Sequence, residues 1–128
     1  MNAPDEGRRS TFVLEGLDDP DFVTLLRTCD NVLLHKGNDY TQGKEGEFGT
    51  LKSFYDSAED VGIEPFQVLY VLLNKHLSAI RSFLKRGQVE SEPIESRIVD
   101  AINYLFLLYK MIQVQRRKEA APPGQHPV

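Results

Sequence analysis

Apolar residues recur at helical spacing along four stretches of the chain, and glycine and proline separate these stretches. The first stretch follows Asp19-Pro20, where the proline suits the first turn of a helix, and Gly37 is expected to end it. The second runs from Thr50 to Val61, directly before Gly62. No stretch alternates between apolar and polar residues for long enough to predict a strand. The pattern therefore predicts an all-α fold.

The two C-terminal stretches are the longest. A Glu-Pro pair precedes each of them, at residues 64–65 and 92–93. The third stretch runs to Arg86, before Gly87, and the fourth runs from Ile94 to Arg117 without glycine or proline. At 1.5 Å per residue both helices are about 35 Å long. We expect a compact bundle of three to four helices in which these two are the longest.

The fourth stretch contains a belt, residues 104–109, that is apolar or aromatic on every side of a helix. Such a pattern is typical of a helix that is buried all round. An exposed belt would favour aggregation of a monomer. We therefore predict a homo-oligomer, with Leu105 to Tyr109 in the interface.

The remaining segments define the domain organisation. Residues 1–18 are mostly polar and are expected to form an N-terminal arm, and residues 19–117 form the helical domain. Residues 118–128 contain three prolines and one glycine, which predicts a disordered tail. Residues 37–49 are rich in glycine and are expected to form a loop, and the sequence leaves open whether this loop closes on a ligand.

Composition excludes several classes of function. The chain of 128 residues is long enough for one domain, and its net charge of −4 does not favour duplex nucleic acid as a partner. No stretch approaches the ~20 apolar residues of a membrane span, and the N-terminus lacks the apolar core of a signal peptide, so a cytoplasmic protein is expected. Cys29 is the only cysteine, which excludes an intramolecular disulfide; it lies on an apolar stripe and is expected to be a buried thiol.

A group of polar residues adjoins the apolar belt. Arg97, Asp100 and Asn103 recur at three-residue spacing on one helix, and Tyr104 follows them. A carboxylate and an amide beside an aliphatic belt cost free energy unless something pairs with them. Either Arg97 pairs with Asp100 while Asn103 bonds across the bundle, or a ligand completes the group.

Other polar residues add to this candidate site. Lys75 lies in the middle of the third stretch between apolar turns and needs a counter-charge or a route to solvent. Its neighbour His76 lies on the apolar face and is expected to be a buried, hydrogen-bonded histidine. At the glycine-rich segment, Lys36, Asp39 and Tyr40 supply charge and an aromatic ring.

These residues together resemble a known family. The shared motifs, which span roughly residues 30–112, are Lys36-x-x-Asp39-Tyr40, Phe48, Lys75-His76, Glu92 to Glu95 and Asp100-x-x-Asn103-Tyr104. They are similar to the small "nucleotide modification associated domain" proteins of bacteriophages. The resemblance implies a helical phage protein that is linked to nucleotides, with no settled reaction. It points to Asp39, Tyr40, Lys75, Asp100 and Asn103 as functional residues.

The leading hypothesis is a binding protein without covalent chemistry or cofactor. It would sequester a nucleotide-derived signal, of a cyclic or ADP-ribose type, in the host cytoplasm and so act as an anti-defence sponge. Positive side chains would hold phosphate, Asp100 and Asn103 would read a base edge or a ribose hydroxyl, and a tyrosine would stack on the base. The expected ligand-binding residues are Lys36, Asp39, Tyr40, Lys75, Arg97, Asp100, Asn103 and Tyr104.

A second resemblance gives an enzymatic alternative. All-α nucleoside-triphosphate pyrophosphatases of the MazG type hold magnesium with Glu-x-x-Glu on one helix and Glu-x-x-Asp on the next. Glu92 and Glu95 have the first spacing, and Asp100 would be a third ligand. Arg97 and Asn103 stand where that family's pattern requires carboxylates. A purely structural helical protein that forms oligomers is the third possibility.

Overall fold

The computed structural model describes residues 14–41, 51–87 and 92–120, and the side chains of residues 36–41 are outside this description. A short 3₁₀ helix, η1, spans Glu15–Leu17. Four α-helices follow, and their bounds are α2 Pro20–Thr41, α3 Lys52–Val61, α4 Pro65–Arg86 and α5 Ile94–Ala120. Within these described ranges every regular element is a helix, which confirms the predicted all-α class.

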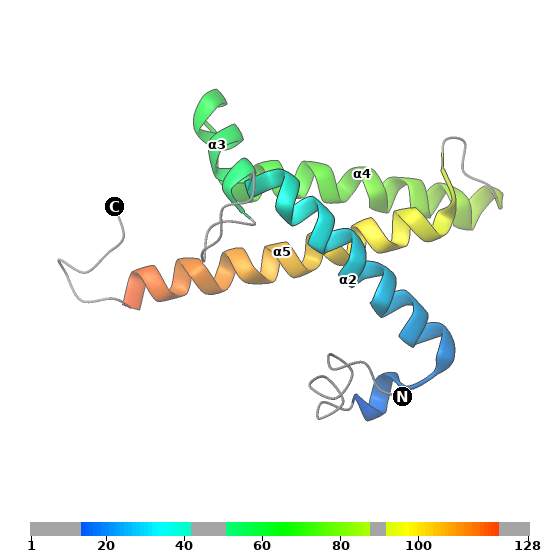
Figure 1. The fold of residues 1–128 in the computed structure, drawn as a ribbon. Helices are drawn as coiled ribbons and strands as arrows, with labels where there is room; N and C mark the ends of the chain where they lie inside the picture. The colour runs from blue at the N-terminus through cyan, green and yellow to red at the C-terminus, as the bar shows by residue number, and fades with distance from the viewer. Residues whose placement is uncertain (1–13, 42–50, 88–91, 121–128) are drawn as a thin grey trace.

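Two long helices, α4 and α5, lie antiparallel and side by side, and they form the most extensive helix pair (Figure 1). Helix α2 crosses in front of α5 in this view, and α3 lies at the N-terminal end of α4. The α4–α5 pair is therefore the frame on which α2 and α3 pack.

No helix in the described part of the chain combines the length and the apolar character needed to cross a membrane.

The predicted helix ends of α3 and α4 depend on two glycines. Gly62 and Gly87 have φ angles of 74° and 78°, in the left-handed region that glycine adopts without steric cost. The Gly87 N–H donates to the carbonyl of Phe83. At the start of α4, the Gln67 side-chain oxygen accepts a hydrogen bond of 2.9 Å from the Glu64 N–H. These ends are confirmed.

The expected end of the first helix is wrong. Helix α2 continues through Gly37 to Thr41, so the segment 37–49 does not begin as a loop, and residues 42–50 lie outside the described part. A glycine inside a helix costs only about 1 kcal/mol relative to alanine, which continued backbone hydrogen bonding offsets. Helix α5 likewise continues past Arg117 to Ala120, into the first residues of the expected tail.

The main hydrophobic core lies where α3 meets the α4–α5 pair. It is formed by buried residues from just before α3 and from all three helices: Leu51, Phe54, Leu69, Leu107, Met111 and Val114. Leu51 immediately precedes α3 and is fully buried. Because these side chains come from segments far apart in the sequence, the core holds α3 against the frame.

Replacing Met111 by alanine is expected to lower the free energy of unfolding by about 2–5 kcal/mol, because its side chain is 1% exposed and leaves a cavity. Leu34→Ala is the matched control, since Leu34 is 61% exposed on α2 and should change stability by less than about 0.5 kcal/mol. Urea unfolding followed by circular dichroism measures both. Equal losses would contradict the assignment of the core.

Candidate functional site

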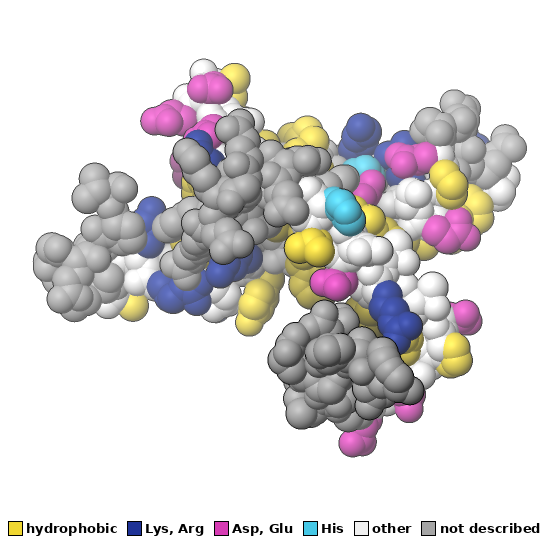
Figure 2. Space-filling view, in the orientation of Figure 1, with side chains coloured by type: hydrophobic (Ala, Val, Ile, Leu, Met, Phe, Trp, Pro, Cys, Tyr) yellow, Lys and Arg dark blue, Asp and Glu magenta, His cyan; other side chains and the backbone are white. Residues whose placement is uncertain are grey.

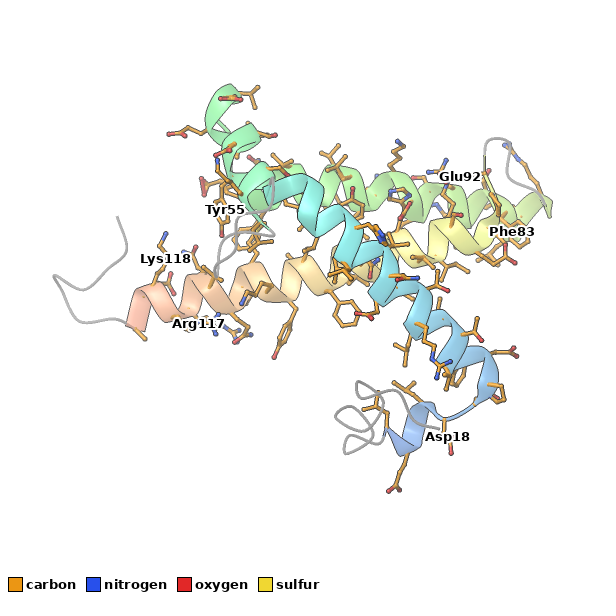
Figure 3. The ribbon with its side chains drawn as sticks, in the orientation of Figure 1. Asp18, Tyr55, Phe83, Glu92, Arg117 and Lys118 are labelled. Carbon is orange, nitrogen blue, oxygen red and sulfur yellow. The ribbon has the colours of Figure 1, made fainter. Side chains whose placement is uncertain are left out.

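The polar residues singled out in the sequence meet at the junction of three helices. Helix α4 contributes His76, α5 contributes Arg97, Asp100 and Asn103, and α2 contributes the backbone of Cys29. Glu92, just before α5, lies beside α4 (Figure 3). We call Glu92, His76, Arg97, Asp100 and Asn103 the junction cluster.

Arg97 is the central charge of the junction cluster, and it is buried with 9% of its surface exposed. Its Nη1 donates to Nδ1 of His76 over 3.2 Å. Its Nε lies 3.2 Å from Oε1 of Glu92, in an ion pair that lacks the alignment of a hydrogen bond. A buried guanidinium requires such partners, since an uncompensated buried charge costs several kcal/mol.

His76 is held as a neutral ring. Since Nδ1 accepts from Arg97, the ring proton is assigned to Nε2. Burial lowers the pKa of His76 below its ordinary value of 6.5; the Asp100 carboxylate opposes this, while Arg97 and Lys75 lower the pKa further. Asp100 Oδ2 lies 3.8 Å from Nδ1, which is an electrostatic contact and no hydrogen bond.

Tyr104 connects the junction cluster to the core. Its ring stacks on His76 with centroids 5.4 Å apart, and it meets Phe54 edge to face at 6.2 Å. Such aromatic pairs stabilise packing beyond their buried area. The ring expected to stack on a base is therefore already stacked on a histidine.

Asn103 ties α2 to α5. Its side-chain nitrogen donates to the carbonyl of Cys29 over 3.1 Å, and the amide is 6% exposed. A carbonyl can only accept, so this bond fixes which way the amide points. Its Oδ1 is buried and has no hydrogen-bond partner among the described residues. A buried acceptor left in this way costs about 1–3 kcal/mol, which favours a partner from beyond the described residues.

A pocket of about 300 Å³ adjoins this amide between α2 and α5. Its lining is mostly apolar and consists of Leu26, Cys29, Asp30, Leu33, Asn103 and Phe106. Ligand sites typically combine apolar walls with a few fixed polar groups. We call this cavity the α2–α5 pocket.

Cys29 behaves as the buried thiol that the sequence predicts. It is 2% exposed, and burial raises the pKa of the thiol, with a further rise from the Asp100 carboxylate. Both effects keep the sulfur protonated and weakly nucleophilic. The Cys29 side chain therefore forms part of the pocket wall, and its backbone carbonyl accepts the hydrogen bond from Asn103.

Some predicted site residues lie apart from the junction cluster or outside the description. Lys75 is exposed on α4, next to His76 in the sequence. The backbone of Lys36, Asp39 and Tyr40 belongs to the last turns of α2, and nothing is described of their side chains.

The candidate magnesium ligands are not brought together as a set. Glu92 forms its ion pair with Arg97, while Glu95 is exposed. Across residues 14–35, 51–87 and 92–120, no three His, Cys, Asp or Glu side chains are grouped closely enough to hold a metal ion. Asp100 instead lies beside His76.

Sequence reasoning missed three participants in this site. His76 was expected to be buried, but nothing in the sequence pairs it with Arg97, which lies 21 positions further along the chain. The Cys29 carbonyl is a backbone group and leaves no signal in a pattern of side chains. Phe106 was assigned to the apolar belt, and only the crossing of α2 places it at a pocket.

The stability of the fold is expected to fall as the pH drops below about 6.5, because His76 has a lowered pKa in the folded state. As the pH falls, the histidine of the unfolded chain takes up a proton before that of the folded chain. The contribution of the neutral His76 to the free energy of unfolding is therefore fully present above pH 6.5 and is lost as the pH falls through the folded-state pKa. His76→Gln should reduce the loss of melting temperature between pH 7.5 and 5.5. His35→Gln is the control, since His35 is exposed. A pH dependence equal in all three proteins would contradict this assignment.

The thiol of Cys29 is expected to react with Ellman's reagent at least about a hundredfold more slowly in the native protein than in urea. The reason is its burial and its raised pKa. Stopped-flow absorbance at pH 8 gives both rates. Fast native labelling would show that Cys29 is not buried in the folded protein.

Comparison with known proteins adds no family assignment. The chain matches no family model, and it has no significant match among curated proteins or solved structures. The function is therefore argued from the residues of this chain.

Proposed function

We propose that this chain binds a nucleotide or a nucleotide-derived signalling molecule and sequesters it without covalent chemistry. The observation that carries the proposal is the buried Oδ1 of Asn103, which lacks a partner in the described part of the chain and belongs to a pocket-lining residue. A ligand that donates an N–H to this oxygen removes the cost of leaving it unpaired. Such a donor is present on the edge of every nucleobase.

The α2–α5 pocket suits the base of such a ligand. Its volume of about 300 Å³ is at the lower end of the range of small-molecule sites. Leu26, Leu33 and Phe106 supply apolar surface for a planar ring, and the Asp30 carboxylate supplies a second acceptor. Phe106 takes over the stacking role, since Tyr104 packs on His76.

We propose that the basic residues of the site bind the phosphate groups of the ligand. Lys75 is exposed on α4, and Arg97 is buried behind Glu92, whose side chain is 37% exposed. We propose that a phosphate competes with the Glu92 carboxylate for Arg97, since both anions fit a guanidinium. Lys36, Asp39 and Tyr40 remain proposed ligand residues at the end of α2.

We favour sequestration over hydrolysis because of the surroundings of two side chains, Glu92 and Cys29. The Glu92 carboxylate forms an ion pair with Arg97, which competes with magnesium for the same oxygens. The Cys29 thiol is buried and its pKa is raised. The similarity to phage proteins that are linked to nucleotides supports a role in the cytoplasm of a host cell. We further propose that the chain works as a homo-oligomer.

Thermal shift against a panel of nucleotides, cyclic nucleotides and ADP-ribose, with magnesium or with EDTA, tests this function. A ligand present at 100 times its Kd stabilises the folded form by about 2.7 kcal/mol. We expect stabilisation in EDTA and recovery of the ligand intact. Product formation that EDTA abolishes would instead favour the MazG-like alternative with Glu92, Glu95 and Asp100.

Two neighbouring residues provide a matched pair of variants for this test. Phe106 and Leu105 are 50% and 49% exposed, but only Phe106 lines the pocket. Phe106→Ala is expected to weaken binding about 5- to 150-fold, because base–aromatic stacking contributes about 1–3 kcal/mol. Leu105→Ala should leave the ligand Kd unchanged. Equal effects of both substitutions would contradict the pocket.

A purely structural role is the second candidate, and the contacts of Arg97 favour it. The guanidinium already bonds to His76 and pairs with Glu92, and Asn103 bonds across the bundle to Cys29. Such contacts fix the register of packed helices. The absence of a thermal shift with every compound in the panel would favour this role.

A further inference from the structure

Helix α5 carries two apolar faces, and the described structure covers only one of them. The covered face points toward α4 and α3 and includes Leu107, Met111 and Val114. Helix α2 packs on an adjacent side, next to Asn103 and Phe106. The other face is occupied by a second stripe, which consists of Ile98, Ile102, Leu105, Tyr109 and Ile112.

The spacing of this second stripe is that of a helix–helix seam. Its members follow one another at alternating intervals of four and three residues. This repeat keeps apolar side chains along one line and is the pattern by which two helices pack. Leu105 and Tyr109 are 49% and 67% exposed, and the three isoleucines are half-buried. The stripe therefore has the pattern of a seam without a partner in the described structure.

Helix α4 extends the same surface. Four of its apolar side chains are exposed on the flank beside its buried Leu69 and Leu73: Phe66, Tyr70, Leu77 and Leu84. Helices α4 and α5 are both right-handed and run antiparallel. For this reason the exposed flank of α4 and the second stripe of α5 lie on the same side of the α4–α5 pair. Helix α2 lies on the opposite side, in front of α5 in Figure 1. We call the combined surface the open flank.

The balance of burial agrees with a missing partner. The described residues expose fourteen large hydrophobic side chains and bury only eleven hydrophobic residues. Six of the fourteen belong to the open flank: Phe66, Tyr70, Leu77, Leu84, Leu105 and Tyr109. Contiguous exposed apolar surface of this kind marks an interaction site.

Charge along α5 indicates what covers the open flank. Glu95 is exposed near the start of the helix, and Arg116 is exposed near its end, close to the stripe. Figure 2 views the molecule from the α2 side, opposite the open flank, and shows Lys and Arg side chains along the C-terminal part of α5 on that side. An antiparallel copy of the same helix places each Glu95 beside the Arg116 of its partner, whereas a parallel copy places like charges together.

We propose that two copies of this chain dimerise through the open flank, with their α5 helices antiparallel and crossing at Leu105. A two-fold axis at Leu105 sets Leu105 against Leu105, Ile102 against Tyr109 and Ile98 against Ile112, and this makes the surface self-complementary. The result is a four-helix interface made by two α4–α5 pairs. This dimer specifies the proposed homo-oligomer and does not depend on nucleotide binding, since the α2–α5 pocket lies on a different side of α5.

Light scattering coupled to size-exclusion chromatography tests the assembly and the surface. The full-length protein is expected to be a dimer at micromolar concentration, and Leu105→Asp is expected to be monomeric with unchanged helical circular dichroism. Val61→Asp, at a 68% exposed position on α3, should remain dimeric. A monomeric wild-type protein would overturn both the homo-oligomer and this interface, whereas a dimeric Leu105→Asp protein would overturn the interface alone.

Cross-linking and a charge exchange test the antiparallel arrangement. Leu105→Cys should form a disulfide-linked dimer under mild oxidation, because Cys29 is buried and the new thiols meet at the axis. Leu34→Cys, at a position on α2 that is 61% exposed, should not. Glu95→Arg or Arg116→Glu alone should weaken the dimer about tenfold, and the double exchange should restore it. Failure of the double exchange to restore the wild-type Kd would overturn the antiparallel arrangement.

Discussion

The burial of the Arg97 guanidinium between α4 and α5 is the constraint on which the arrangement of the site depends. A buried cation must be surrounded by groups that accept its hydrogen bonds or balance its charge. The chain supplies a neutral imidazole from α4 and a carboxylate from the residues before α5. The contact with His76 joins residues 21 positions apart in the sequence, so it sets how α4 and α5 lie against each other. The stacking of Tyr104 on His76 then joins this arrangement to the core.

The two sides of α5 have different consequences for function. On one side, Asn103 uses its nitrogen to hold α2 and leaves its oxygen for another donor next to a pocket. On the other, a regularly spaced apolar stripe is partly exposed to solvent. We propose that a ligand supplies the donor for this oxygen and that a second copy of the chain covers the stripe. Because different faces of one helix carry them, ligand binding and self-association can be altered separately.

The resemblance to phage proteins and the structure address different parts of the function. In the function that we propose, the resemblance suggests the class of ligand and the contacts suggest its position. The base would lie near α2, and Arg97 would bind a phosphate only after it exchanges Glu92. This exchange gives the site an energetic threshold, since a bound anion must replace an existing ion pair. A multiply charged phosphate meets that requirement better than a single carboxylate.

The sequence by itself determined the helical class, the ends of α3 and α4 and the burial of Cys29 and His76. These features follow from local rules: glycine adopts a left-handed conformation, proline suits a first helical turn, and apolar residues repeat at helical spacing. Local rules failed at Gly37, where continued hydrogen bonding offsets the small cost of glycine and α2 extends to Thr41. They also could not pair Arg97 with His76, bring the Cys29 carbonyl to Asn103 or set Phe106 at a pocket. The packing of α4 against α5 decided the first contact and the packing of α2 against α5 decided the other two, because each joins groups that share no local spacing in the chain.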